Sequence, residues 1–157
     1  MAGILCPVDF STSSNNALEF AIEIAKRKNA LLILFHAYQV YVADTTAVIP
    51  ELTVEALHES VIAKLENLKT ELLQKENLNI EVAAGFGFTS DAIKEATENY
   101  GIDYVVMGTT GASGLSRVFL GSNAASCIDK LKVPVIAVPA NAQFRGMDKI
   151  IFASALH

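Results

Sequence analysis

A glycine-rich segment suited to binding an anion lies in the last third of the sequence. Residues 108–122 contain four of the chain's nine glycines, at positions 108, 111, 114 and 121. They lie within residues 104–128, which contain no Asp or Glu although the whole chain has a net charge of −5. Glycine lets backbone N–H groups close around a bulky anion, and the lack of carboxylates removes repulsion. The segment therefore predicts a binding site for a phosphate group.

The end of this segment adds the start of a helix. Gly121 and Ser122 are expected to open a helix whose first N–H groups and dipole favour negative charge, and Ser122 can also donate its hydroxyl. No Gly-Lys-Ser/Thr follows at the spacing of a Walker A loop, so affinity would come from the backbone and from Arg117. Two simpler interpretations stay open: the glycines as turn formers only, and Arg117 as a solvated loop residue.

Short apolar runs alternate with amphipathic stretches along the whole chain. Strands are predicted at residues 4–8, 31–38, 79–84, 103–107 and 133–138. Helices are predicted after the Ser/Thr/Asn cluster at 11–16, over about 51–76, from a cap at Thr89 or Ser90 to Tyr100, and over 122–131. The alternation predicts an α/β fold: an open, doubly wound, parallel five-stranded sheet of order 3-2-1-4-5 with helices on both faces.

The expected strand order locates the site. In such sheets ligands bind beyond the carboxyl ends of the strands where the winding direction reverses, which here is between the first and fourth strands. The segment Pro7-Val8-Asp9 ends the first strand, and Met107, Gly108 and Thr109 end the fourth. These two segments are expected to face each other across the site.

The glycine segment resembles the nucleotide motif of the universal stress protein family, Gly-x2-Gly-x9-Gly-Ser/Thr. Gly108, Gly111, Gly121 and Ser122 match every fixed position. The resemblance extends to Pro7-Val8-Asp9-Phe10-Ser11 and to Val133-Pro134-Val135, hence to nearly all of residues 1–140. It implies the ATP-binding branch of the family, with ATP (or ADP or AMP) and Mg²⁺ as ligands.

The resemblance also implies a role for most residues of the site. Pro7 and Asp9 would lie beside the adenosine, and the backbone of Ala37 would face the adenine. The ribose and first phosphates would lie beside the end of the fourth strand and the loop after it, and the distal phosphates at the helix start. The residues concerned are Met107, Gly108 and Gly111 for the first group, and Gly121, Ser122 and Asn123 for the second. Val8, Thr109 and Arg117 complete the expected set of binding residues.

The remaining reactive residues predict no catalytic centre and no metal ligands. The three histidines have neither triad nor metal-ligand spacing, so we interpret His36, His58 and His157 as structural. Asp9 could also cap the first helix. The segment Gly85-Phe86-Gly87 is interpreted as a turn. Cys6 and Cys127 form no CxxC pair and are given no redox role. Because no general base is evident near the phosphate loop, efficient ATP hydrolysis is not expected.

Composition and the chain ends set further expectations. The chain has 12 basic and 17 acidic residues and no long basic cluster, so we expect no binding to nucleic acid. Its first residues do not resemble a signal peptide, and its apolar runs are too short to span a bilayer. We therefore expect a cytoplasmic protein that does not bind a membrane. The strand from Val133 to Val138 contains a proline, which suggests a sheet edge, and related proteins of the family form homodimers through it. Residues 149–155 parallel residues 3–9, so 141–157 resemble a linker and the first strand of a second repeat.

These expectations combine into one functional hypothesis with two alternatives. The chain is interpreted as an ATP-binding stress-response module whose output is nucleotide-dependent association, with little or no hydrolysis. One alternative is a dimeric interaction protein of the same family that binds no nucleotide. The other is a nucleotidyl-transfer enzyme of related fold, which would need a catalytic His or Lys near the phosphate loop.

Overall fold

The computed structural model describes residues 2–40, 51–110 and 120–147, apart from the side chains of residues 51 and 52. Strands and helices alternate through these residues. They are, in chain order, β1 (Gly3–Pro7), α1 (Thr12–Lys28), β2 (Leu31–Tyr38), α2 (Glu51–Leu73), β3 (Asn79–Phe86), α3 (Thr89–Asn99), β4 (Tyr104–Gly108), α4 (Ser122–Lys130) and β5 (Val135–Val138).

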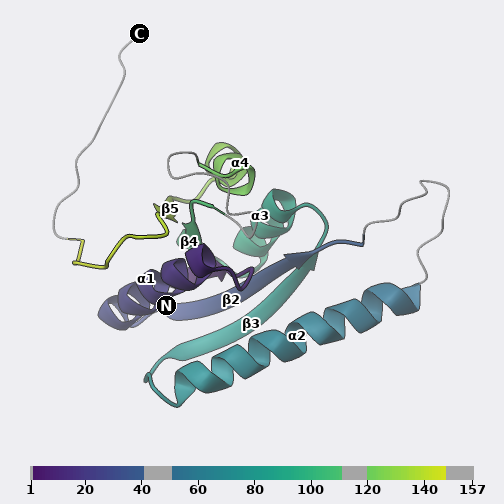
Figure 1. Cartoon of the computed structure of the whole chain (residues 1–157), viewed down its shortest axis with the longest axis horizontal. Helices are drawn as coiled ribbons and strands as arrows, with labels where there is room; N and C mark the ends of the chain where they lie inside the picture. Colours follow the sequence, from purple (N-terminus) through teal and green to yellow (C-terminus); the bar gives the residue numbers. More distant parts are fainter. Residues whose placement is uncertain (1, 41–50, 111–119, 148–157) are drawn as a thin grey trace, which may run out of the picture.

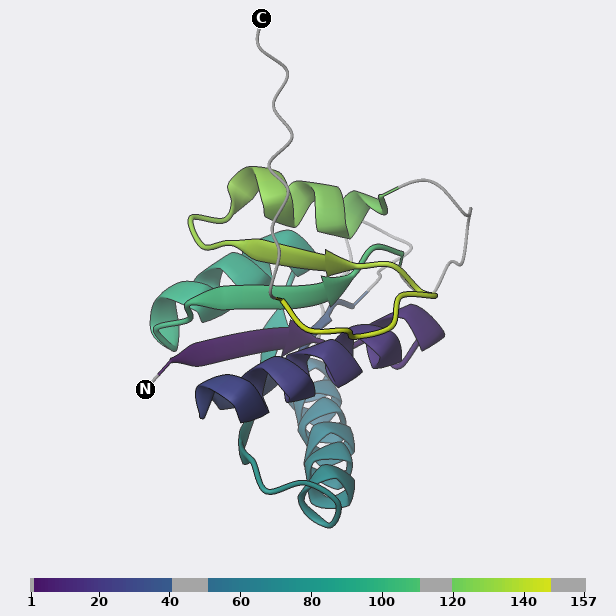
Figure 2. The same cartoon turned by 90° about the vertical axis from the view of Figure 1, so that its left-hand side faces the viewer.

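The five strands form one parallel sheet in the order β3-β2-β1-β4-β5, which confirms the predicted fold class and strand order. Helices α1 and α2 pack against one face and α3 and α4 against the other (Figure 1). In Figure 2 the arrows of β1, β4 and β5 point the same way, with α4 on one side of them and α1 on the other. The carboxyl ends of the strands thus meet at one edge of the sheet.

The packing of the core explains why the strands are continuous apolar runs in the sequence. In β1, Ile4 and Cys6 face the helices α1 and α2, whereas Leu5 faces α3 and α4. All three side chains are fully buried. A parallel strand covered on both faces has no solvent side, so no alternation of polar and apolar residues is expected.

Most predicted element boundaries differ from the structure by one to three residues, and two of the differences have a clear physical reason. α2 ends at Leu73 rather than Glu76, although Glu76 N still donates to Leu72 O at 2.8 Å, so the helical hydrogen bonds continue briefly beyond its end. β5 begins at Val135 rather than Val133. Pro134 lacks an N–H donor and contributes only its carbonyl, which accepts from Val105 N at 3.0 Å.

The predicted side-chain cap of α3 is wrong. Thr89 and Ser90 lie inside the helix, and the N-cap residue is Phe88, which makes no side-chain capping hydrogen bond. The prediction of a turn at residues 85–87 is only partly correct. Gly85 and Phe86 are the last residues of β3 and pair with β2, and the turn begins at Gly87, whose φ is +119°.

The segment after β5 packs back onto α1. Asn16 Nδ2 donates to Pro139 O at 2.8 Å and to Ala142 O at 3.1 Å, while the Phe144 ring meets Phe20 edge-on with ring centres 5.3 Å apart. Figure 2 shows this segment, in yellow, passing alongside α1. The described part of the expected linker is therefore fixed on the domain, and the strand expected at 149–155 lies outside the described residues.

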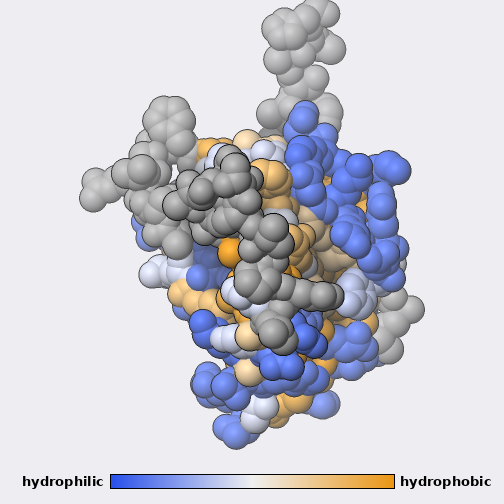
Figure 3. All heavy atoms as spheres, turned by 90° about the vertical axis from the view of Figure 1, so that its right-hand side faces the viewer, coloured by the Kyte–Doolittle hydropathy of each residue, from blue (hydrophilic) through white to orange (hydrophobic). Residues whose placement is uncertain are grey.

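The surface is mixed in polarity. In Figure 3 hydrophilic residues, in blue, cover much of the upper right and the lower part of the face, and hydrophobic residues, in orange, gather nearer its middle. Phe86 and Phe88 are among the large hydrophobic side chains that stay exposed. Within residues 2–40, 51–110 and 120–147, no helix is both long enough and apolar enough to pass through a membrane.

Candidate functional site

The turn between β1 and α1 forms one wall of the site. Asp9 Oδ1 accepts a hydrogen bond from Ser11 N at 3.0 Å, and Asp9 N donates to Ser14 Oγ at 3.0 Å. Phe10, between them, has a positive φ of 61°, a conformation uncommon for a residue other than glycine. The cap of α1 is Ser11, the first residue of the Ser/Thr/Asn cluster expected before this helix, and its Oγ accepts from Ser14 N at 3.2 Å. The alternative, Asp9 as the cap, is wrong.

Gly108 lets the end of β4 approach the start of α1 closely. A Cβ atom at this position would lie 2.5 Å from Ser13 Oγ and 3.0 Å from the backbone carbonyl atoms of Ser13. Distances this short require the backbone of α1 to move. Glycine at this first position of the motif therefore holds the two walls of the site together.

The start of α4 provides the expected backbone donors. Gly121 is the N-cap and offers no side chain to the helix, and the first helical hydrogen bond is donated by Ala125 N to Gly121 O at 2.9 Å. The N–H groups of Ser122, Asn123 and Ala124 precede that bond, so they have no helical acceptor. Their position is fixed by Gly121 N, which donates to Thr109 O at 2.6 Å.

A cavity of about 330 Å³ lies where these segments meet, at the carboxyl edge of the sheet. It is lined by ten of the twelve residues predicted to bind nucleotide, whereas Gly111 and Arg117 lie outside the described residues. The ten are Pro7, Val8, Asp9, Ala37, Met107, Gly108, Thr109, Gly121, Ser122 and Asn123. The structure thus brings together residues from β1, β2, β4 and α4.

Sequence reasoning missed five lining residues: Ser14, His36, Thr89, Thr110 and Ala124. Each of them lies within five residues of a predicted one or begins a helix at the same sheet edge, so their position along the chain could have signalled them. His36 is expected to be structural, which agrees with its Nδ1 lying 2.6 Å from Val8 O, but this residue also lines the cavity.

Few titratable side chains line the described part of the site. Asp9 and His36 are the titratable side chains among its described lining residues. Burial raises the pKa of Cys6 to about 12 and that of Cys127 to about 11, so both thiols stay protonated at neutral pH. In the described ranges no three His, Cys, Asp or Glu side chains gather where they could hold a metal ion.

Comparison with known proteins identifies the family. The universal stress protein family matches residues 2–139, and the chain belongs to it. Universal stress protein MJ0531 of Methanocaldococcus jannaschii is 32% identical over 142 residues, which cover 86% of this chain and 80% of that protein.

Solved structures have the same fold. The universal stress protein UspA of Lactobacillus plantarum is 26% identical, with a TM-score of 0.74 over 87% of this chain and 97% of that one. A universal stress protein of Arabidopsis thaliana, solved with AMP bound, is 18% identical with a TM-score of 0.58 over 90% of this chain and 94% of that one. The first supports the family, and the second shows the fold.

Proposed function

We propose that this universal stress protein binds an adenine nucleotide (ATP, ADP or AMP) in the cavity at the carboxyl edge of the sheet. In this proposal Pro7, Val8, Asp9 and the Ala37 backbone contact the adenosine. Met107, Gly108, Thr109 and Gly111 flank the ribose and the first phosphates. Gly121, Ser122 and Asn123 bind the distal phosphates, with Arg117 as a further contact, and Mg²⁺ enters with the phosphate groups.

The observation that carries the proposal is the uncapped start of α4 inside the cavity. Three consecutive N–H groups without helical acceptors, together with the helix dipole, favour an anion at this place. The lack of any side-chain cap means that no group of the helix itself competes for them. A volume of about 330 Å³ also lies at the lower end of the range usual for small-molecule sites.

A relative supports the identity of the ligand. The Arabidopsis protein of the same fold was solved with AMP bound. The motif glycines at 108 and 121 line the cavity in this chain, so a phosphate group on an adenosine has backbone donors within the same hollow.

The proposed output is nucleotide-dependent association in a stress response, with little turnover. Of the described titratable groups, Asp9 lies in the turn after β1 and His36 on β2, whereas the proposed phosphate site belongs to the end of β4 and to α4. No described side chain beside the phosphate site can activate water. Phosphate release should therefore stay far below the typical enzymatic rate of about 10 s⁻¹, and turnover near that rate would favour the enzyme alternative.

Calorimetry on the pair Gly121→Asp and Gly121→Asn tests nucleotide binding. Both side chains can cap α4, and they are nearly the same size, but only Asp adds a negative charge at the phosphate site. We expect Gly121→Asp to fold at least as stably as the wild type, and to bind ATP at least about tenfold more weakly than Gly121→Asn. No heat from the wild type with millimolar ATP, ADP or AMP would refute the proposal and favour the interaction protein that binds no nucleotide.

We also propose that two copies associate through β5 and that residues 141–157 are a linker and the first strand of a second repeat. β5 is an edge strand of the sheet, and an edge of Val and Ile residues is a ready template for pairing. Sedimentation should give a dimer at high micromolar concentration, and a monomer there would contradict the assembly.

A further inference from the structure

His36 has a fixed tautomer. Its Nδ1 lies 2.6 Å from the carbonyl oxygen of Val8, and a carbonyl oxygen can only accept. Nδ1 therefore carries the proton, and in the neutral ring Nε2 has a free lone pair. The Phe10 ring packs on the imidazole with centres 5.8 Å apart, which further restricts its orientation.

The other ring nitrogen is available to a ligand. His36 lines the cavity, and no described residue donates a hydrogen bond to its Nε2. Nε2 is not among the buried polar atoms that lack a partner, so water can reach it, and a ligand in the cavity would replace that water. A molecule in the cavity that offers an N–H or O–H group would satisfy it.

The cavity is also polarised from one end to the other. His36 on β2 and Asp9 after β1 place acceptors at one end. The N–H groups at the start of α4, beyond β4, have no helical acceptor and place donors at the other. A ligand that complements both ends carries donor groups on one side and an anion on the other, as a nucleoside phosphate does.

We propose that His36 is a ligand-binding residue, whose Nε2 accepts a hydrogen bond from the nucleoside end of the nucleotide. This inference rests on the proposed function and adds a contact to it. The donor is either the exocyclic amino group of adenine or a ribose hydroxyl. The Nδ1 hydrogen bond to Val8 holds the ring in place for this contact and, at the same time, fixes the turn that carries Asp9.

Two substitutions separate the contact from the support of the turn. In His36→Asn the amide nitrogen replaces Nδ1 and keeps the bond to Val8, but nothing replaces Nε2. In His36→Gln the amide oxygen reaches the position of Nε2 and can accept, whereas the donor to Val8 is lost. If His36 only supports the turn, His36→Gln should lower the affinity for nucleotide more than His36→Asn does. If Nε2 binds the ligand, His36→Asn should lower the affinity more.

Calorimetry with AMP on the full chain decides between these roles. We expect His36→Asn to weaken AMP binding about five- to tenfold, the loss of one hydrogen bond, and His36→Gln to weaken it less. Thermal unfolding should show the opposite order, with His36→Gln the less stable variant. Equal losses of affinity in the two variants, or an unchanged affinity in His36→Asn, would overturn the inference.

Ligand analogues identify the donor and keep the test independent of folding. Inosine monophosphate lacks the amino group, and 2′-deoxy and 3′-deoxy AMP each lack one hydroxyl. One of the three analogues should bind the wild type severalfold more weakly than AMP binds it. The same analogue should bind His36→Asn as tightly as it binds the wild type, because the analogue already lacks the contact that the substitution removes. If every analogue binds wild type as AMP does, the inference fails while the proposed function stands, and if wild type binds no nucleotide at all, both fail.

Discussion

Helices α1 and α4 begin at the same edge of the sheet beside the same cavity, yet they begin in different ways. α1 has its own cap, since Ser11 Oγ accepts from Ser14 N at 3.2 Å. α4 starts at Gly121 and has no side-chain cap. The first helix satisfies its end with its own side chain and gains stability, whereas the second leaves its first N–H groups without a side-chain acceptor of its own. The same backbone feature thus supports the fold in one place and, in the proposed function, binds the ligand in the other.

The contact that joins the two helix starts should be the most sensitive place. Gly108→Ala puts a methyl group 2.5 Å from Ser13 Oγ and 3.0 Å from its backbone. Because backbone atoms must move, we expect a loss of about 1–3 kcal/mol in the free energy of unfolding, together with loss of nucleotide binding. Chemical denaturation and calorimetry measure the two effects.

A glycine at the opposite end of the sheet, the amino end of β1, provides a control for this prediction. In Gly3→Ala the added Cβ would lie 3.1 Å from Gly101 O and 3.2 Å from the flexible end of the Ile102 side chain, which is a milder clash and far from the cavity. It should destabilise the chain less and leave binding intact. If Gly108→Ala is as stable as the wild type, the two walls of the site are not held together as described.

Alanine at the two helix starts should have opposite consequences. Ser11→Ala removes the cap of α1 and should cost about 1 kcal/mol of stability, with little change in affinity for ATP. Ser122→Ala removes no capping bond, because the N-cap of α4 is Gly121, so stability should change little while affinity falls. Thermal unfolding and calorimetry of both variants test the comparison, and equal stability losses would contradict it.

The sequence predicted the parts of the molecule that depend on local patterns. The apolar runs gave the five strands, and the spacing of glycines gave the place of the cavity. It did not predict contacts between residues far apart in the chain. His36 meets Val8 only because β1 and β2 pair in one register, and Gly108 meets Ser13 only because α1 crosses the end of β4.

Local chemistry also misled where two residues competed for one role. Asp9 and Ser11 are both good caps, and the helix uses Ser11 while the Asp9 carboxylate accepts from Ser11 N. At α3, Thr89 and Ser90 are good caps, but the N-cap position falls on Phe88, directly before Thr89. Capping preference ranks residue types by how well they cap a helix. Which residue occupies the N-cap position of α3 is decided by the point at which the chain leaves β3.

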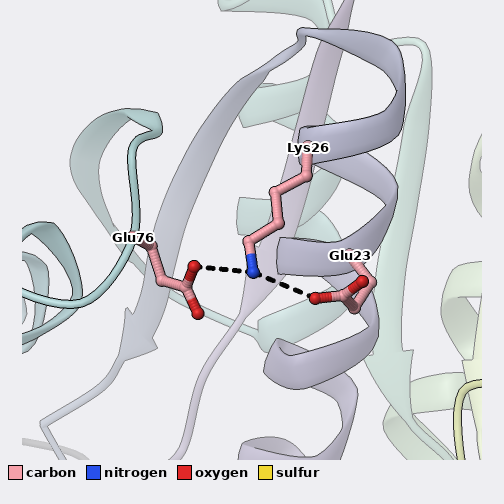
Figure 4. A network of polar contacts seen from close by, with 3 residues as sticks. All are labelled: Glu23, Lys26 and Glu76. Atoms are coloured by element: carbon pink, nitrogen blue, oxygen red, sulfur yellow. Dashed lines mark hydrogen bonds and ion pairs between the residues drawn. The ribbon is translucent and has the colours of Figure 1, made fainter.

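The smallest effect is expected at the other end of α1, far from the cavity. Lys26 Nζ lies 2.6 Å from Glu76 Oε2 and 3.0 Å from Glu23 Oε1, and so ties α1 to the turn after α2 (Figure 4). Hydrogen bonds to Glu76, and then to Glu23, raise the pKa of Lys26 above its ordinary value of 10.5. The side chains of Lys26 and Glu76 are about one-third exposed, so solvent and salt screen the pair.

Glu76→Gln should therefore lower stability less than Ser11→Ala does and leave affinity for ATP unchanged. A group whose pKa is raised by folding stabilises the folded state fully below its unfolded pKa, and this contribution disappears as the pH rises through the folded value. The difference in stability between wild type and Glu76→Gln should thus be constant at neutral pH and shrink in solutions more alkaline than pH 10.5. Glu19→Gln, which makes the same charge change at an exposed site of α1 without a described ion pair, is the control. A difference that persists at high pH, or an equal loss in Glu19→Gln, would mean that net charge rather than the Lys26 pair stabilises this end of the helix.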